Sequence, residues 1–293
     1  MAIKIYTDAS SNLFESILRK KNLDITVLPM RVEIDDQSYL CYEDKIDVQE
    51  FSKTFYEKML EGHRPKTSLP NPGLFQEKME EEISKGNKVL YISLAGGISG
   101  TYQTCTMIAN QINTAHKGDY VRVVNSKTAG LGEGMICMKA YELSKNTDDL
   151  DALVRQVEEC VKCTRSEFVV DSLIYLTNSG RISKLTAKVA SILSLKPLLY
   201  GSDEGKIELT SIARGQIKAL KKLASQAIEN IKDKASTVYI SHCNNLEGAN
   251  HLKDFLHVGG IDNVEIYFYD LVTGAHVGPG TVALFYEGYN RKV

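Results

Sequence analysis

The first half of the chain alternates between two hydrophobic patterns. Residues 3–7, 88–93 and 120–125 are short runs rich in β-branched and aromatic residues, which predict buried strands. Each run is followed by Gly, Ser, Asp or Asn and then by a stretch with helical periodicity. These helices are predicted over residues 13–21, 102–115 and 132–144. Strands that alternate with helices predict a parallel, Rossmann-like sheet with helices on its faces.

Two further features complete this half. Residues 28–33 and 38–41 predict a hairpin, and residues 150–163 predict a strongly amphipathic helix. We place a domain boundary at the end of that helix, which divides the chain into residues 1–163 and 164–293. A length of 293 residues also favours two domains.

The second half of the chain has a different pattern. The turn Ser202-Asp203-Glu204-Gly205 separates two short apolar runs and predicts a hairpin. Strands are predicted over residues 167–170, 197–200, 206–209, 237–241 and 265–269. Helices are predicted over residues 187–193, 216–231 and 281–288. The arrangement predicts a second α/β domain with a mixed sheet.

Composition and charge narrow the class of protein. Hydrophobic residues make up 43% of the chain and charged residues 25%, as in ordinary globular proteins. The net charge of −2 predicts no binding to nucleic acid. No apolar run is long enough to span a bilayer, so we expect no stable membrane insertion. The six scattered cysteines and the absence of an export signal favour the cytoplasm.

The loop at residues 96–101 is the most informative local feature. It follows a predicted strand and precedes a predicted helix, so backbone N–H groups and the positive helix end point to one place. Ser99 and Thr101 add hydroxyl groups, and the three glycines allow close approach of an anion. A carboxylate or a phosphate suits this loop, and a tight turn without any ligand explains it equally well.

Known motifs fit this loop poorly. It is not a P-loop, because no Lys-Ser or Lys-Thr follows at the required spacing. It is close to a nucleophile elbow around Ser99, but Thr101 stands where the second glycine is needed. No cluster of histidines and carboxylates has the spacing of a metal site, so we predict no metal.

Three other segments combine polar side chains with turn residues. The segment 66–72 contains two prolines and the hydroxyls of Thr67 and Ser68, and a plain connector between helices is the alternative. Arg181 lies in a predicted turn, where it either pairs with an acid or is simply solvated. His276 lies in the predicted loop 274–280, between Gly and Pro residues, which favours a functional histidine.

Taken in order, these segments resemble the DegV family of bacterial fatty-acid-binding proteins. Any one match alone is weak, but six in order are specific and extend from residue 7 to residue 280. The matching segments are residues 7–13, 66–72, 98–103, 171–176 with 180–182, 196–199 and 274–280.

The resemblance implies that the protein binds one long-chain fatty acid, with its tail in a tunnel between two α/β domains. It implies that Thr67 and Ser99 hold the carboxylate through their hydroxyls, with the amide of Gly100 nearby. Arg181 and His276 match positions that line or support the head-group site. It further implies a lipid-binding protein with no catalytic residues or cofactor of its own, which presents the acid to a separate fatty acid kinase subunit for conversion to acyl phosphate.

Two other functions remain open. The first is a stand-alone serine hydrolase that uses Ser99 with His276. The second is a subunit of a dihydroxyacetone-type kinase that holds its substrate on a histidine. A partner surface is also predicted, because four cations form one basic face that could dock an acidic kinase surface: Arg214, Lys218, Lys221 and Lys222.

Overall fold

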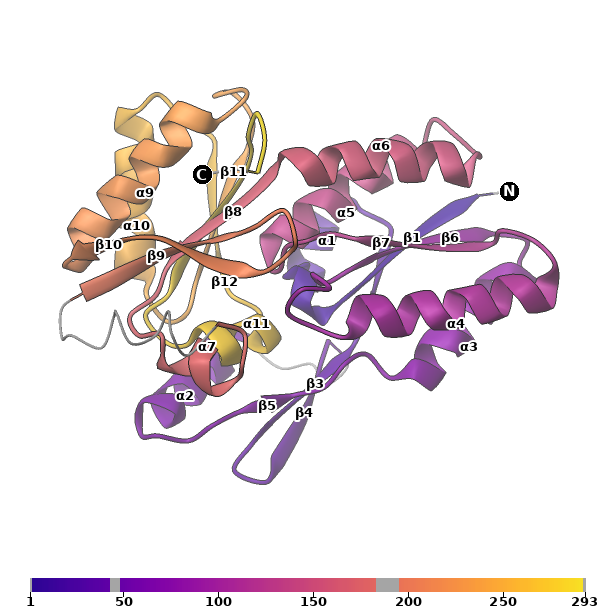
Figure 1. Cartoon of the computed structure of the whole chain (residues 1–293), viewed down its shortest axis with the longest axis horizontal. Helices are drawn as coiled ribbons and strands as arrows, with labels where there is room; N and C mark the ends of the chain where they lie inside the picture. The colour runs from indigo at the N-terminus through magenta and orange to yellow at the C-terminus, as the bar shows by residue number, and fades with distance from the viewer. Residues whose placement is uncertain (1, 43–47, 183–194, 292–293) are drawn as a thin grey trace.

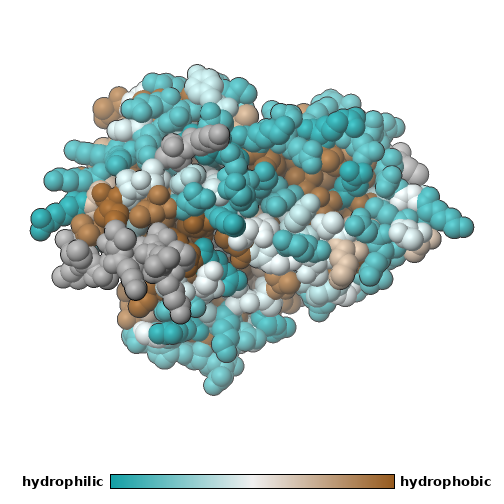
Figure 2. All heavy atoms as spheres, in the orientation of Figure 1, coloured by the Kyte–Doolittle hydropathy of each residue, from teal (hydrophilic) through white to brown (hydrophobic). Residues whose placement is uncertain are grey.

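The protein is built around two β-sheets that lie side by side, with helices packed against them (Figure 1). The computed structural model describes residues 2–42, 48–182 and 195–291. The helix predicted over residues 187–193 lies outside these ranges. Hydrophilic residues cover most of the face shown in Figure 2, and hydrophobic residues are visible in smaller areas between them, as on ordinary globular surfaces.

The first sheet confirms the predicted parallel arrangement. Its strands run in the order β2 (Ile25–Leu28), β1 (Ile3–Asp8), β6 (Lys88–Ser93) and β7 (Val121–Asn125), and every neighbouring pair is parallel. The helices that pack against it are α3 (Pro72–Ser84), α4 (Thr101–His116), α5 (Leu131–Ser144) and α6 (Leu150–Cys163).

Alternation along the strands places side chains on both faces of this sheet. Ile5 and Leu90 belong to one apolar core, whereas the neighbouring residues Tyr6 and Tyr91 belong to another. Because both faces are covered by helices, the strands are apolar almost throughout, as expected for a buried parallel sheet.

The second sheet is mixed, which also confirms the prediction. Its order is β10 (Ile207–Arg214), β9 (Leu195–Gly201), β8 (Thr164–Val169), β13 (Val282–Glu287), β11 (Val238–His242) and β12 (Val264–Phe268). Only β11 and β12 are parallel neighbours, and β9 with β10 forms the predicted hairpin. The helices α9 (Gln216–Asn230) and α10 (Leu246–Val258) pack against this sheet and against each other.

The helix predicted over residues 281–288 is wrong. These residues form β13, which lies between β8 and β11 inside the second sheet. Five of its six residues are buried, so both faces are apolar and the strand lacks the alternation of a half-exposed strand. A short, continuous apolar run does not distinguish a buried strand from a helix.

A small third sheet lies beside the pocket described below. The hairpin of β3 (Met30–Ile34) and β4 (Gln37–Cys41) confirms the predicted one, and the two-residue strand β5 (Lys66–Thr67) pairs with β3. The prediction did not include β5, because two residues carry no hydrophobic period. The remaining elements are η1 (Ala9–Ser11), α1 (Glu15–Lys20), α2 (Val48–Leu60), α7 (Ile174–Asn178) and α11 (Leu271–Val277).

Helix α5 joins the two sheets. It contacts β1 and β6 of the first sheet as well as β8, β11 and β13 of the second. Apolar residues surround it, and Glu133, Gly134 and Cys137 are all buried on it. The first sheet ends before Cys163 and the second begins at Thr164, where we propose the domain boundary.

Candidate ligand-binding site

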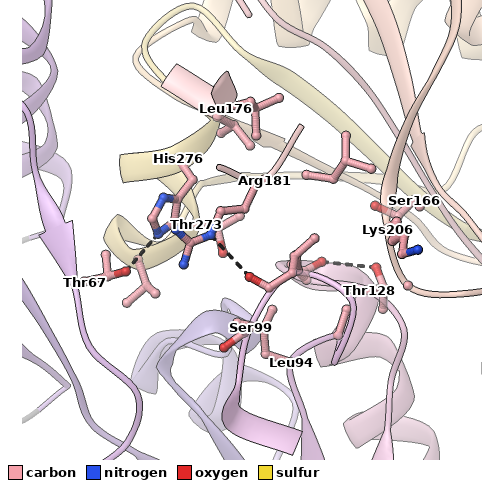
Figure 3. A pocket seen from close by; sticks show the side chains of 18 of the residues that line it. Thr67, Leu94, Ser99, Thr128, Ser166, Leu176, Arg181, Lys206, Thr273 and His276 are labelled. Atoms are coloured by element: carbon pink, nitrogen blue, oxygen red, sulfur yellow. Dashed lines mark hydrogen bonds between the residues drawn. The ribbon is translucent and has the colours of Figure 1, made fainter. Parts of the chain in front are cut away.

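One pocket of about 250 Å³ lies between the two sheets (Figure 3). Its walls come from the loops after β6 and β7, from β5, β8 and α11, and from the tip of the β9–β10 hairpin. Large apolar side chains form much of the lining: Met30, Leu94, Ile98, Phe168, Leu176, Ile207, Tyr269, Val272 and Val277. Thr67, Ser99, Arg181 and His276, four of the five candidates from the sequence, line this same pocket. Gly100 is exposed next to Ser99 and is not part of the lining.

Thr67 and His276 meet at one end of the pocket. Thr67 Oγ1 lies 2.8 Å from His276 Nε2, although 209 residues separate them in the sequence. Pairing of β5 with β3 places Thr67 beside the buried Val32. His276 lies in the last turn of α11, which corrects the prediction that it lies in a loop.

Helix α11 is fixed at both ends. The Asp270 carboxylate caps its N-terminus by accepting a bond of 2.6 Å from the Thr273 amide, and the Asp270 amide donates to Asn12 Oδ1 at 2.7 Å. At the other end Gly278 has a φ of +83°, and Tyr175 of α7 fills the space where a side chain would lie. The segments 7–13 and 274–280 of the sequence therefore act together to position His276.

His276 is neutral at physiological pH. Burial lowers the pKa of its imidazole to about 4, and the nearby Arg181 guanidinium contributes to the shift. Its second ring nitrogen, Nδ1, is buried and has no hydrogen-bond partner among the described residues. A neutral histidine that contacts Thr67 can orient the Thr67 hydroxyl without adding a charge to the site.

The loop 96–101 has an ordered set of hydrogen bonds. The amides of Ile98 and Ser99 both donate to the carbonyl of Ala95, each at 3.1 Å. Ser99 Oγ lies 2.9 Å from Thr101 Oγ1 and accepts a bond of 3.3 Å from the Thr101 amide. The hydroxyl of Ser99 thus lies at the start of α4, and the Gly100 amide is not used in a hydrogen bond within the described residues.

Gly97 allows the loop 96–101 to contact the β9–β10 hairpin closely. A Cβ atom at position 97 would lie 2.5 Å from the carbonyl oxygen of Gly205, at the tip of the β9–β10 hairpin. The hairpin and the Gly-rich loop therefore touch backbone to backbone and close one side of the pocket.

Arg181 supplies a positive charge to the pocket. Its Nε donates to the Ile98 carbonyl at 3.2 Å, and its Nη1 donates to the carbonyl of Ser179. It forms no ion pair with a carboxylate of the described residues, and burial lowers its pKa from the usual value. The guanidinium is thus held close to the Gly-rich loop and retains capacity for an anionic ligand.

Sequence reasoning missed several lining residues. Ser166 and Phe168 face the pocket from alternate positions of β8, and Thr273 lies one helical turn before His276. The predicted strand begins at residue 167, so the pattern does not include Ser166. Among the described residues, no group of three or more His, Cys, Asp or Glu side chains is placed to hold a metal ion. No helix within those residues is long and apolar enough to cross a membrane.

Comparisons with known proteins point to one family. The model of the DegV family, described as uncharacterised proteins, matches residues 2–288. The DegV domain-containing protein CPE0026 of Clostridium perfringens is 32% identical over 290 residues, which cover 98% of each chain. Its sequence therefore matches over nearly the whole length of both proteins.

Two solved structures share the fold. A DegV family protein from Thermus thermophilus, described as binding fatty acid, has a TM-score of 0.84 at 27% identity and covers 98% of this chain and 100% of its own. The Streptococcus pneumoniae fatty acid kinase B3 protein, solved with linoleic acid, has a TM-score of 0.82 at 18% identity and covers 98% of this chain and 99% of its own. The family match and the full-length relative establish that the chain belongs to the DegV family.

Proposed function

We propose that this protein binds one long-chain fatty acid in the pocket between its two sheets. The carboxylate lies beside Thr67 and Ser99, and the acyl tail lies along the apolar walls. The observation that carries this proposal is one pocket whose lining combines Thr67, Ser99 and Arg181 with many large apolar side chains. The fatty acid binding described for the Thermus thermophilus protein, which is 27% identical, supports it.

The polar groups fit a carboxylate. A buried carboxylate needs hydrogen-bond donors to offset the loss of water. When His276 donates from Nε2 to Thr67 Oγ1, the hydroxyl hydrogen of Thr67 is free to point at the ligand. Ser99 and the Gly100 amide add neutral donors, and Arg181 adds the compensating charge. Each bond to the charged ligand contributes about 1.5–3 kcal/mol.

The apolar walls supply the remaining affinity. Transfer of an acyl chain from water into such a pocket gains about 0.8 kcal/mol for each buried methylene. The Met30, Phe168 and Leu176 side chains lie in this wall. Apolar contacts of this kind have no directional preference. We therefore expect the size and shape of the pocket to determine which acyl chain lengths bind.

We also propose that the protein presents its fatty acid to a separate kinase subunit and performs no catalysis itself. This part rests on the family and on one surface. The basic face consists of Arg214, at the end of β10, and Lys218, Lys221 and Lys222 on α9. All four side chains are exposed, and none forms an ion pair with a carboxylate of the described residues. The positions on α9 share one helix face, which suits an acidic partner surface.

The geometry favours lipid binding over the two alternatives. A serine hydrolase needs a base that contacts the serine and an acid that orients the base. Here Ser99 Oγ bonds to Thr101, His276 bonds to Thr67, and His276 Nδ1 has no acid partner within the described chain. A kinase subunit for dihydroxyacetone is less well supported, because large apolar side chains form much of the pocket lining and suit an acyl chain.

Native mass spectrometry of freshly purified protein tests ligand binding directly. We expect one bound long-chain acid for each chain, and uptake of added palmitate or oleate after delipidation. Thr67→Val and Ser99→Ala should each weaken the binding of palmitate by roughly 10-fold, since each removes a donor to the carboxylate. Thr26→Val, at an exposed position on β2, is the matched control and should bind normally. Protein that is isolated empty and takes up neither acid would refute the proposal.

A further inference from the structure

Ser166 faces the pocket from the middle of the second sheet. Along β8, Ser166 and Phe168 line the pocket, whereas Arg165 and Glu167 point to the opposite face of the strand. There Arg165 Nε and Glu167 Oε1 form a buried ion pair at 2.8 Å, and the hydroxyl of Tyr286 donates to the same carboxylate oxygen at 2.6 Å. This fixed pair on the far face holds β8 in register, so the orientation of Ser166 is well determined.

The position of Ser166 is distinct from the head-group end. Figure 3 shows Ser166 on one side of the pocket, near Lys206, and Thr67 with His276 on the other side. Gly201 lies next to Ser166 on β9, and a Cβ atom at position 201 would lie 3.9 Å from Ser166 Cβ. Ser166 and Gly201 therefore lie side by side in the part of the wall that is distant from the proposed carboxylate site.

The hydroxyl of Ser166 has no hydrogen-bond partner within the part of the chain that the structure describes. The residue is 8% exposed, and its Oγ forms no hydrogen bond with any atom of the described residues. An unsubstituted acyl tail packed against this hydroxyl would displace its water without supplying a hydrogen-bond partner, which costs free energy. With alanine at this position, the pocket would bind an unsubstituted tail without that cost. The serine is therefore matched to a ligand that carries a polar group at this depth.

We infer that Ser166 is a specificity-determining residue that recognises a hydroxyl group on the acyl chain, so that the pocket accepts long-chain hydroxy fatty acids. This inference rests on the proposed fatty acid binding and adds the chemical class of the ligand. A chain hydroxyl both donates to and accepts from the serine, which satisfies both groups inside the apolar pocket. Ser166 has a fixed place in the wall, so recognition depends on the position of the hydroxyl along the chain.

The test is a binding series with delipidated protein. Affinities are measured for hexadecanoic acid and for a set of hexadecanoic acids that carry one hydroxyl at successive carbons from the middle of the chain to its end. We expect one position to bind at least as tightly as the unsubstituted acid, and neighbouring positions to bind about 10-fold more weakly. Ser166→Ala should weaken the favoured hydroxy acid by about 10-fold and leave hexadecanoic acid unchanged or tighter.

A matched control separates this effect from general damage to the fold. Ser241 on β11 is fully buried and its hydroxyl has no partner among the described residues, but it lies outside the pocket lining. Ser241→Ala should leave the preference among the acids unchanged. If hexadecanoic acid binds but no hydroxy acid responds to Ser166→Ala, the inference about Ser166 is wrong and the proposed function stands. If hexadecanoic acid itself does not bind to the wild-type protein, the proposed function fails.

Discussion

The Nη2 nitrogen of Arg291 lies 2.6 Å from the carbonyl oxygen of Lys127, in the wall of the pocket. The same guanidinium donates to the carbonyls of Gly201 and Ser202 in the β9–β10 hairpin. It also donates to the carbonyls of Val161 and Thr164, where α6 passes into β8. One side chain thus connects three segments around the pocket: the loop after β7, the β9–β10 hairpin and the junction of α6 with β8.

Arg291 is consequently expected to hold the pocket closed. It is 3% exposed and forms no ion pair with a described carboxylate, so the carbonyl dipoles and the more distant charge of Asp203 compensate its charge, and burial lowers its pKa to about 10. Arg291→Lys keeps the charge but cannot span the same carbonyls, because an ammonium lacks the planar fork. We expect a loss of about 2–4 kcal/mol in the free energy of unfolding by urea. The exposed Arg155→Lys on α6 is the control, and equal stability of the two variants would contradict this role.

Gly97 provides a second test of how the pocket is closed. In Gly97→Ala the new methyl group must displace the backbone of Gly205, so the hairpin has to move away from the Gly-rich loop. We expect a loss of about 1–3 kcal/mol in unfolding free energy, measured by thermal or urea denaturation. At Gly100 the nearest atom to an added Cβ is 3.8 Å away, so Gly100→Ala should be close to neutral. A neutral result for Gly97→Ala would mean that the two loops do not make this contact in solution.

Glu133 gives a prediction for the dependence of stability on pH. Its carboxyl group accepts bonds from Thr7 at 2.8 Å and Ser10 at 3.1 Å, and Ser10 Oγ also bonds to the carboxyl group of Asp8. One hydroxyl hydrogen cannot serve two carboxylates. Burial and the charge of Asp8 raise the pKa of Glu133 well above its usual value, so the folded protein holds Glu133 protonated.

The sign of the effect follows from this raised pKa. The unfolded chain releases the proton near pH 4, whereas the folded chain keeps it. The contribution of Glu133 to the free energy of unfolding is therefore complete below about pH 4, and it is lost as the pH rises toward the pKa of Glu133 in the folded protein. Glu133→Gln removes the titration, so we expect it to unfold with a free energy roughly 1–3 kcal/mol higher at pH 8 and a flatter pH profile. Glu142→Gln, exposed on the same helix, should retain the wild-type profile.

Local patterns explain what could be predicted from the sequence. The parallel sheet was predictable because β1, β6 and β7 are apolar runs bounded by turn residues, although its edge strand β2 was not predicted. The strand β13 was not, because burial on both faces removes its alternation. The strand β5 exists only through pairing with β3.

In the candidate site too, some residues could be predicted from local motifs and others could not. Thr67, Ser99, Arg181 and His276 lie in motifs that are visible along the chain, and all four line one pocket. The bond between Thr67 and His276 depends on how two distant segments pack, which no local pattern records. Ser166 carries no motif at all, since its role depends on the face of β8 that the fold turns toward the pocket.

The basic face makes the proposed kinase partnership testable apart from lipid binding. Arg214 ends β10, the strand whose first residue, Ile207, lines the pocket, so this strand connects the basic face to the pocket wall. Arg214→Ala removes an exposed cation without touching the pocket lining, and we expect the rate of acyl phosphate formation by the kinase subunit to fall by about 10-fold. The affinity for palmitate should stay the same. Arg155→Ala, also an exposed arginine, is the control for loss of charge alone. Equal phosphorylation rates for the wild type and Arg214→Ala would remove this surface from the docking site, while weaker palmitate binding would show that the substitution acts on the pocket instead.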